Sequence, residues 1–188
     1  MATIVVSDNV SLDGVIQDPV GDEGFSRGGW VGFIKDRPEL GLLALEGALA
    51  TEALLMGRRT YEWFASRWPA RNGALADRLN SLPKYVVSST LADPEWTNTT
   101  VITGDWLDEV KNLKRQLDGR IVVDASAGLA RTLIEHDLVD ELQLKVFPVI
   151  LGDGERLFDV TSDKRAFRLA EVRTLDGDSV LLRYTRAQ

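Results

Sequence analysis

The segment from Ile121 to Gly154 constrains the fold of this 188-residue chain more than any other. It opens with Ile121-Val122-Val123, a continuous apolar run typical of a strand buried on both faces, as in parallel sheets. A turn of small residues at 124–128 comes next, and apolar residues then recur at helical spacing over 129–136. A second apolar run fills 138–146. The segment therefore predicts a strand, a turn, a helix and a further strand, the unit from which α/β sheets are built.

The rest of the chain alternates short apolar runs with helical patterns. The expected strands are 2–7, 54–56, 85–87 and 99–103, and the expected helices are 40–53, 61–68, 74–82 and 106–117. Such alternation predicts an α/β fold with a mainly parallel sheet. Two extended runs, 165–174 and 179–186, flank Asp176-Gly177, which predicts a C-terminal antiparallel hairpin. At this length we expect a single domain over residues 1–188.

Composition excludes several classes of function. The net charge of −7 and a pI near 4.8 oppose a nucleic-acid partner, because phosphate backbones are bound by clustered Lys and Arg. There is no cysteine and only one histidine, His136, so we expect no disulfide, no catalytic thiol and no metal site built on these ligands. No run of eighteen apolar residues and no leader is present, so we expect no membrane span and a cytoplasmic location.

An anionic ligand of such an acidic protein needs a few local cations and N–H groups. Gly57-Arg58-Arg59-Thr60 lies between an expected strand and an expected helix, with Thr60 as a plausible N-cap. A helix N-terminus favours an anion, and the planar guanidinium group suits phosphate. The segment predicts a phosphate site, and a solvated helix start is the alternative.

Three other junctions offer groups to the same ligand. Ser88-Ser89-Thr90 ends the strand 85–87 and can donate to a phosphate or close a turn. Gly104 ends the strand 99–103. The small residues of the 124–128 turn allow a phosphate or nicotinamide to approach the N–H groups of the following helix. The alternative is a tight connection in which Ser126 caps that helix.

Residues 8–29, which are rich in Asp and Gly, predict a long irregular loop near the start of the chain. Loops of this length in a compact domain are usually functional or disordered. Asp13-Gly14 is a turn signal. Trp30 and Phe33 follow, and they can either wall a pocket or pin the loop to the core.

Four motifs resemble, in family order, the dihydrofolate reductase-like superfamily, and more narrowly the reductase domain of the bifunctional riboflavin-biosynthesis enzyme. They are SLDG at 11–14, LLMGRRTYEWF at 54–64, KYVVSSTL at 84–91 and LVDELQLKVFPVILGDGERLF at 138–158. The resemblance implies a three-layer α/β/α fold with a mixed, mainly parallel central sheet. It also implies a cleft at the carboxyl ends of the strands that binds NADPH and a small-molecule substrate, often in a homodimer.

The resemblance also implies roles for particular segments. In the family, the segment matching 57–60 meets the cofactor phosphates, the segment matching 88–90 lies near the adenosine phosphate, and the turn matching 124–129 covers the pyrophosphate and the nicotinamide. The expected cofactor-binding residues are Gly57, Arg58, Arg59, Thr60, Ser88, Ser89, Thr90, Gly104, Ala125, Ser126, Ala127, Gly128 and Leu129. The riboflavin-pathway reductases carry an acidic residue at the place of Asp124, facing their pyrimidine. Asp124 can therefore orient a heterocycle or simply cap a helix.

The expected function is that of an NADPH-dependent reductase. It would transfer a hydride to a small heterocyclic, carbonyl or imine substrate, as the reductase of 5-amino-6-(5-phosphoribosylamino)uracil does. Asp13 and Asp124 are the candidate catalytic residues and, with Trp30 and Phe33, the candidate substrate-binding residues. The alternatives are a non-catalytic NADP-binding module and a dimeric scaffold that has lost the cofactor. The second alternative rests on the alanines at 125 and 127, where relatives commonly have glycine.

Overall fold

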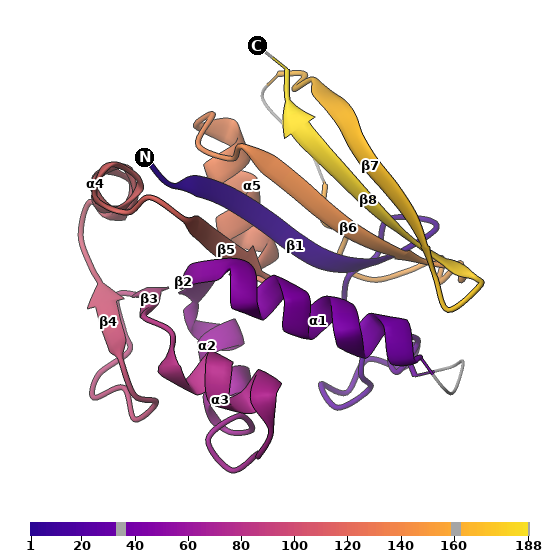
Figure 1. Ribbon diagram of the computed structural model, residues 1–188, viewed down its shortest axis with the longest axis horizontal. Coiled ribbons are helices and arrows are strands. Elements are labelled where there is room, and N and C mark those ends of the chain that lie inside the picture. The colour runs from indigo at the N-terminus through magenta and orange to yellow at the C-terminus, as the bar shows by residue number, and fades with distance from the viewer. Residues whose placement is uncertain (33–36, 159–162, 188) are drawn as a thin grey trace.

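An eight-stranded mixed sheet forms the centre of the molecule, with strand order β4-β3-β2-β5-β1-β6-β8-β7 (Figure 1). The computed structural model describes residues 1–32, 37–158 and 163–187. Six strands run parallel, and β8 and β7 are antiparallel additions beside β6. The strands are β1 Thr3–Ser11, β2 Thr51–Gly57, β3 Lys84–Val87, β4 Thr99–Ile102, β5 Arg120–Asp124, β6 Glu141–Phe147, β7 Phe167–Leu175 and β8 Ser179–Arg186.

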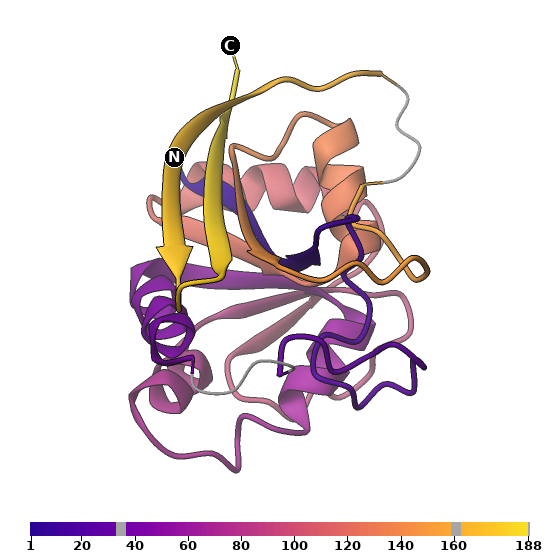
Figure 2. The same ribbon diagram turned by 90° about the vertical axis from the view of Figure 1, so that its right-hand side faces the viewer.

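Within the described part of the chain, five helices cover the two faces of this sheet. They are α1 Pro38–Ala50, α2 Arg58–Ala65, α3 Ala74–Ser81, α4 Trp106–Gln116 and α5 Ala127–Glu135. Helices α4 and α5 lie on one face, and α1, α2 and α3 lie on the other (Figures 1 and 2). The expected α/β/α arrangement with a C-terminal antiparallel hairpin is confirmed.

Strand β2 contributes side chains to two hydrophobic cores, one on each face of the sheet. Leu55 packs into the core under α4 and α5, while Leu54 and Met56 pack into the core under α1, α2 and α3. All three side chains are at most 5% exposed. A continuous apolar run is therefore required here, since successive side chains of a strand point to opposite faces.

Two expected boundaries are wrong in ways that affect the site. Residues 8–11 continue β1 and pair in parallel with β6, from Asp8 opposite Leu144 to Ser11 opposite Phe147. The expected loop therefore begins only after Ser11. Helix α1 ends at Ala50, and residues 51–53, expected to be helical, belong to β2 and pair with β5.

The hairpin between β7 and β8 turns at the predicted residues. Asp176 and Gly177 both have positive φ angles, of 50° and 81°. Asp and Gly tolerate this region of backbone space better than most residues do. The turn places Ser179 opposite Leu175 and sets the register of the hairpin as far as Glu171, beyond which the register shifts.

Candidate functional site

A cleft with a cavity volume of about 1190 Å³ opens on the face that carries α1 and α2. Its walls come from the loop around residues 16–23, from α1, from the start of α2 and from the turn between β5 and α5. Its floor includes Ser7 of β1, Asp124 of β5, and Gln143 and Lys145 of β6. Ser7 lies in register with both Asp124 and Gln143, so these three side chains share one face of the sheet.

The turn between β5 and α5 has an unusual backbone. Ala125 and Ser126 are both left-handed, with φ of 53° and 54°. This conformation is strained for residues with a Cβ, which explains why glycine suits these positions. Left-handed Ser126 precedes helical Ala127, and such a pair directs successive N–H groups to one side in an anion-binding concavity.

Ser126 links this turn to the start of α2. Its hydroxyl accepts the N–H of Gly57 over 3.1 Å and donates to Thr60 Oγ1 over 2.7 Å. Ser126 occupies the N-cap position of α5, but its side chain makes no capping hydrogen bond to that helix. The alternative interpretation of Ser126 as a side-chain cap is therefore wrong.

Helix α2 begins earlier than expected, at Arg58, and Gly57 is its N-cap. Thr60 lies in the first turn and is not the N-cap, because the chain is already helical from Arg58 onward. The side chain of Arg58 is 48% exposed and pairs with Glu62 at 3.4 Å. The side chain of Arg59 is 82% exposed, with Glu23 at 3.9 Å. Both guanidinium groups remain accessible at a helix N-terminus.

Two glycines leave room between these turns. A Cβ added to Gly57 would meet only Ser126 Oγ, at 3.8 Å, and a Cβ on Gly128 would meet nothing within 4 Å. Ala127 is 7% exposed and packs in the core under α5. Its methyl group therefore does not narrow the opening, and Ala125 is the alanine left to crowd a ligand. These residues fit a bound dinucleotide.

The cleft brings together many, though not all, of the residues expected from the sequence. Its lining includes Gly57, Arg58, Arg59, Thr60, Asp124, Ala125, Ser126, Ala127, Gly128 and Leu129. Asp13, Trp30, Ser88, Ser89, Thr90 and Gly104 are not among its lining residues. Ser88 Oγ accepts the N–H groups of Thr90 and Leu91, as in a turn. Phe33 lies outside the described residues.

Asp13 connects two loops. Its carboxylate accepts hydrogen bonds from Ser11 Oγ at 2.7 Å and from the N–H groups of Leu151 and Gly152 at 3.1 and 2.8 Å. The Ser11 hydroxyl, followed by the backbone N–H groups, lowers the pKa of Asp13 to about 2. Asp13 is therefore ionised at neutral pH and holds the loop after β6 against the end of β1.

Trp30 is buried at 5% exposure. Its Nε1 donates to the carbonyl of Gln17 at 2.9 Å, and its ring meets Phe147 edge-on at 5.6 Å. These contacts pin the loop to the sheet, which is one of the two alternatives left open by the sequence.

Asp8 is a site residue that the sequence analysis missed. It lines the cleft near the carboxyl end of β1 and is 4% exposed. Burial, followed by the nearby charge of Asp124, raises its pKa well above the ordinary value of 3.8. Lys145, whose Nζ donates to Ser7 Oγ at 3.2 Å, opposes this effect. A carboxylate inside an apolar strand was the available signal, but Asp8 was assigned to a loop.

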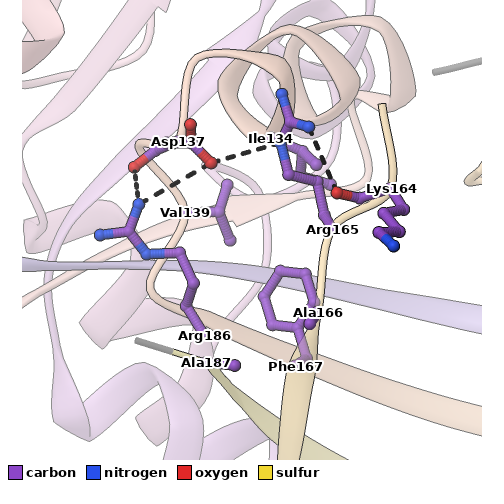
Figure 3. A pocket seen from close by; sticks show the side chains of 9 residues that line it. All are labelled: Ile134, Asp137, Val139, Lys164, Arg165, Ala166, Phe167, Arg186 and Ala187. Atoms are coloured by element: carbon purple, nitrogen blue, oxygen red, sulfur yellow. Dashed lines mark hydrogen bonds and ion pairs between the residues drawn. The ribbon is translucent and has the colours of Figure 1, made fainter. Parts of the chain in front are cut away.

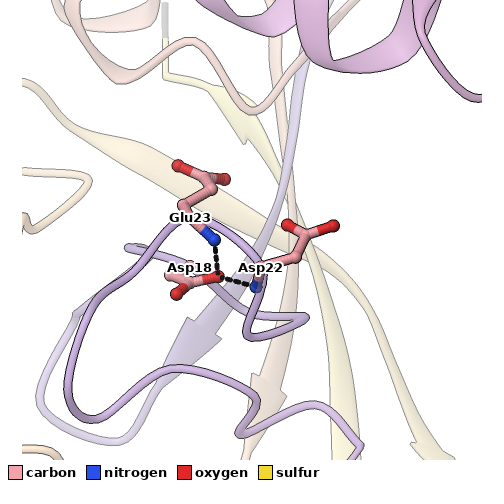
Figure 4. Close-up of side chains that lie close together, drawn as sticks. All are labelled: Asp18, Asp22 and Glu23. Carbon is pink, nitrogen blue, oxygen red and sulfur yellow. Dashed lines mark hydrogen bonds between the residues drawn. The ribbon is translucent and has the colours of Figure 1, made fainter.

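Three acidic side chains gather in the loop after β1, in the arrangement of Figure 4. Asp18 is 1% exposed, and its Oδ1 accepts the N–H groups of Gly21, Asp22 and Glu23. Asp22 binds Trp63 Nε1 at 3.0 Å and Arg67 at 2.6 Å. Their oxygens thus shape the loop and dock it on α2, which accounts for the cluster without a cation.

A smaller pocket of about 230 Å³ lies at the C-terminal end of α5 (Figure 3). Asp137 lies there within 3.3 Å of Arg165 Nε and within 4.0 Å of Arg186 Nη1. Arg165, just before β7, and Arg186, at the end of β8, pair with this one carboxylate and so join both strands to the end of α5. The pocket therefore has the features of a structural joint.

The chain has a dihydrofolate reductase-like fold with a large cleft at the carboxyl ends of parallel strands. The chain belongs to the RibD C-terminal domain family, whose family model matches residues 2–181. It is a family of reductases that typically bind NADP(H). The resemblance inferred from the four motifs is confirmed.

Individual relatives agree with this assignment. The uncharacterized protein YyaP of Bacillus subtilis (strain 168) is 27% identical over 187 residues, covering 96% of this chain and 93% of YyaP. A putative riboflavin biosynthesis protein from Shewanella sp. PV-4 has a TM-score of 0.78 at 22% identity, with full coverage of both chains. Dihydrofolate reductase from Enterococcus faecalis, complexed with NADP(H), has a TM-score of 0.60 at 15% identity, covering 99% and 97% of the two chains.

Among the described residues, none of the helices is both long and apolar enough to cross a membrane.

Proposed function

We propose that this protein is an NADPH-dependent reductase of a small heterocyclic, carbonyl or imine compound, related in chemistry to the aminopyrimidine reductase of riboflavin biosynthesis. The observation that carries the proposal is the joining of two helix N-termini, those of α2 and α5, through the hydroxyl of Ser126 inside one cleft. Helix N-termini present N–H groups and a positive dipole end to anions. Two such ends, facing one cleft, suit a ligand with several phosphate groups.

The residues for holding NADPH divide into two groups. Arg58 and Arg59, with the first N–H groups of α2, would hold the phosphates as charge-assisted donors. After the left-handed turn, the N–H groups of Ser126 and Ala127 would face the pyrophosphate, whereas the N–H of Ala125 donates to the Ser7 carbonyl at 3.3 Å. NADPH supplies a hydride when bound, and the protein supplies position and electrostatics.

The polar floor of the cleft would orient the substrate. Ser7, Asp124, Gln143 and Lys145 offer both donors and acceptors there, which suits a heterocycle that carries amide-like groups. Holding two reactants in contact removes much of the entropic barrier to hydride transfer. The loop docked on α2 through Asp22 would exclude water from one side.

A homodimer formed through α1 is part of the same proposal. This helix is apolar on nearly all sides: Leu43 and Ala48 are buried, while Leu42 and Leu49 remain 60% and 62% exposed. A helix that is hydrophobic all round is normally covered. Light scattering tests the point, since the pair of substitutions Leu42→Lys and Leu49→Lys should convert a dimer to a monomer.

The proposal also places the protein in the cytoplasm, where its family generally acts.

The test of the proposed function is NADPH consumption, followed by absorbance. The first acceptor is 5-amino-6-(5-phosphoribosylamino)uracil, and a panel of cyclic imines and carbonyl compounds follows. We expect turnover with at least one acceptor, and loss of turnover when Arg58 and Arg59 are both replaced by glutamine. Binding of NADPH without consumption across the panel would instead indicate a non-catalytic module, and absence of binding would indicate a scaffold.

A further inference from the structure

Asp8 carries a carboxyl oxygen that the fold leaves unpaired. Its Oδ1 accepts the backbone N–H of Asn9 over 2.9 Å. Its enclosed Oδ2 has no hydrogen-bond partner within the described part of the chain. A buried polar atom without a partner is destabilising and requires a structural or functional explanation. We propose that Asp8 is the acid that protonates the substrate during reduction, an inference that rests on the proposed function.

Position supports this role. Asp8 lies three residues before the end of β1 and lines the cleft although it is 4% exposed. Asp124, from the adjacent strand β5, and Lys145, from β6 on the other side, line the same cleft. Because successive side chains of a strand point to opposite faces, the enclosed Asp8 carboxyl group lies on the sheet face that carries α5, where Leu129 also lines the cleft, and not on the face of Ser7 and Lys145.

Burial and neighbouring carboxylates raise the pKa of Asp8. Burial has the largest effect on its pKa, and the charges of Asp124 and of Glu155, in the loop after β6, raise it further. Lys145 and the Asn9 N–H act in the opposite direction. The net result is a pKa well above that of an ordinary aspartate. A carboxylic acid held neutral in this way can donate a proton at physiological pH.

The other carboxyl groups suit this task less well. Asp13 has a pKa lowered to about 2, so it has no proton to give at neutral pH, and it does not line the cleft. Asp124 lines the cleft and is less buried than Asp8. We therefore assign Asp124 to orienting the substrate and Asp8 to the proton transfer.

The chemical step balances without any further reactant. With the hydride supplied by NADPH, the carbon of a C=N or C=O bond gains a hydrogen and an electron pair. The π electrons move to the nitrogen or oxygen, the O–H bond of Asp8 breaks, and the proton bonds to that atom. Asp8 is left as a carboxylate and recovers a proton from solvent. The substrate class is therefore one whose reduced bond ends in a basic nitrogen or oxygen.

The protonation state of Asp8 can be measured without substrate. Carboxyl-¹³C aspartate labelling of the wild type and of Asp8→Asn identifies the Asp8 resonance by difference. We expect this resonance to remain that of a neutral acid at about pH 7. Asp124→Asn should lower the midpoint of its titration, and Lys145→Met should raise it. A resonance that ionises near pH 4, as that of an exposed aspartate does, would overturn the proposal.

Turnover provides the second arm of the test. Asp8→Asn preserves size but removes the acid, so kcat with the active acceptor should fall by about a hundredfold or more. Its Kd for NADPH should stay within about threefold, because Asp8 is not assigned to the phosphates. The matched control is Asp140→Asn, which changes a carboxylate that binds the N–H of Ile4 and Lys114, and it should leave kcat unchanged.

The outcomes separate the two proposals. Retention of more than about a tenth of kcat by Asp8→Asn would contradict the acid role while leaving the reductase function intact. A wild type that consumes no NADPH with any acceptor would overturn the reductase function and the acid role together, although the NMR titration would still report on Asp8. If Asp8→Asn does not fold, Asp8→Ser replaces it in both arms, with thermal unfolding as the check.

Discussion

The hydroxyl of Ser126 donates a hydrogen bond to Thr60 Oγ1 over 2.7 Å and so joins two turns that lie 66 residues apart in the sequence. The same oxygen accepts the N–H of Gly57. Because Ser126 precedes α5 and Gly57 precedes α2, one side chain fixes the relative position of two helix N-termini. The geometry of the proposed phosphate site depends on this contact.

Replacement of Ser126 by alanine tests the contact. Ser126→Ala removes both hydrogen bonds and leaves the Gly57 N–H without this partner, so the free energy of unfolding should fall by about 1–2 kcal/mol. NADPH should also bind more weakly, since the two turns are no longer held together. Urea unfolding and calorimetry measure the two effects. The control is Ser81→Ala, which removes an exposed hydroxyl that donates to Arg78 O outside the cleft and should change neither quantity appreciably.

Ala125 should tolerate glycine better than other alanines do. Its φ of 53° is strained for a residue with a Cβ, so Ala125→Gly should raise the free energy of unfolding by up to about 1 kcal/mol. The same substitution at Ala44, an exposed position within α1, should lower it by about 1 kcal/mol. Thermal unfolding of both variants measures the two changes in stability. A loss of stability in Ala125→Gly equal to that in Ala44→Gly would contradict the strain argument.

If Ala125 also crowds the cofactor, Ala125→Gly should bind NADPH more tightly than the wild type does. If affinity is unchanged, the methyl group of Ala125 does not meet the ligand. Either result locates the ligand relative to this turn, because the other nearby alanine, Ala127, faces the core.

Asp13 predicts a specific dependence of stability on pH. Its folded pKa of about 2 lies below the ordinary 3.8, so the folded state prefers the charged form. The stabilisation is fully present above pH 3.8 and is lost as the pH falls from 3.8 toward 2, because the unfolded state then binds more protons. Asp13→Asn should lose about 2 kcal/mol at neutral pH, since charged hydrogen bonds are replaced by weaker ones.

The measurement for Asp13 is urea unfolding of the wild type and of Asp13→Asn between pH 2 and pH 7. The difference in stability between them should shrink below pH 4. Asp118→Asn is the control, because that carboxylate is 95% exposed and pairs only with the N-terminal amine among the described residues. A difference that stays constant with pH would contradict the assignment of the low pKa to Asp13.

Lys84 should be required for stability and not for chemistry. It is fully buried, and its Nζ donates to the carbonyls of Asn80, Leu82 and Thr97 at 2.8, 2.9 and 3.0 Å. Lys84→Met leaves these acceptors unsatisfied and should lower the free energy of unfolding by about 3 kcal/mol. Lys111→Met, on an exposed side chain, should change it by less than about 0.5 kcal/mol. Equal effects in calorimetric unfolding of the two variants would contradict this role.

The sequence located the strand-to-helix junctions at 57–60 and 124–129 because each carries a local signal: a glycine and paired arginines in the first, and small residues after an apolar strand in the second. The side-chain bond between Ser126 and Thr60 has no such signal, since it depends on the parallel placement of β2 beside β5. Asp8 and Asn9 were expected in a loop because Asp and Asn are rare in strands. Their pairing with β6 makes them part of β1.

Asp13 and Trp30 illustrate a different limit. Asp13 lies in the family motif SLDG and Trp30 lies outside the four motifs, and both were expected at the substrate. The structure gives Asp13 three hydrogen-bond donors and gives Trp30 a buried place against Phe147. The sequence does not reveal whether the Asp13 carboxylate already accepts hydrogen bonds within the protein, because the donors Leu151 and Gly152 lie more than a hundred positions away.

Calorimetric titration of nucleotide-free protein measures whether the two joined helix N-termini bind NADPH. We expect micromolar affinity for NADPH and at least tenfold weaker binding of NADH, a difference of about 1.4 kcal/mol. Replacing Arg58 and Arg59 by glutamine should remove most of that preference, and the control Arg115→Gln, on α4, should keep it. Absence of NADPH and NADH binding to the wild type would contradict the account.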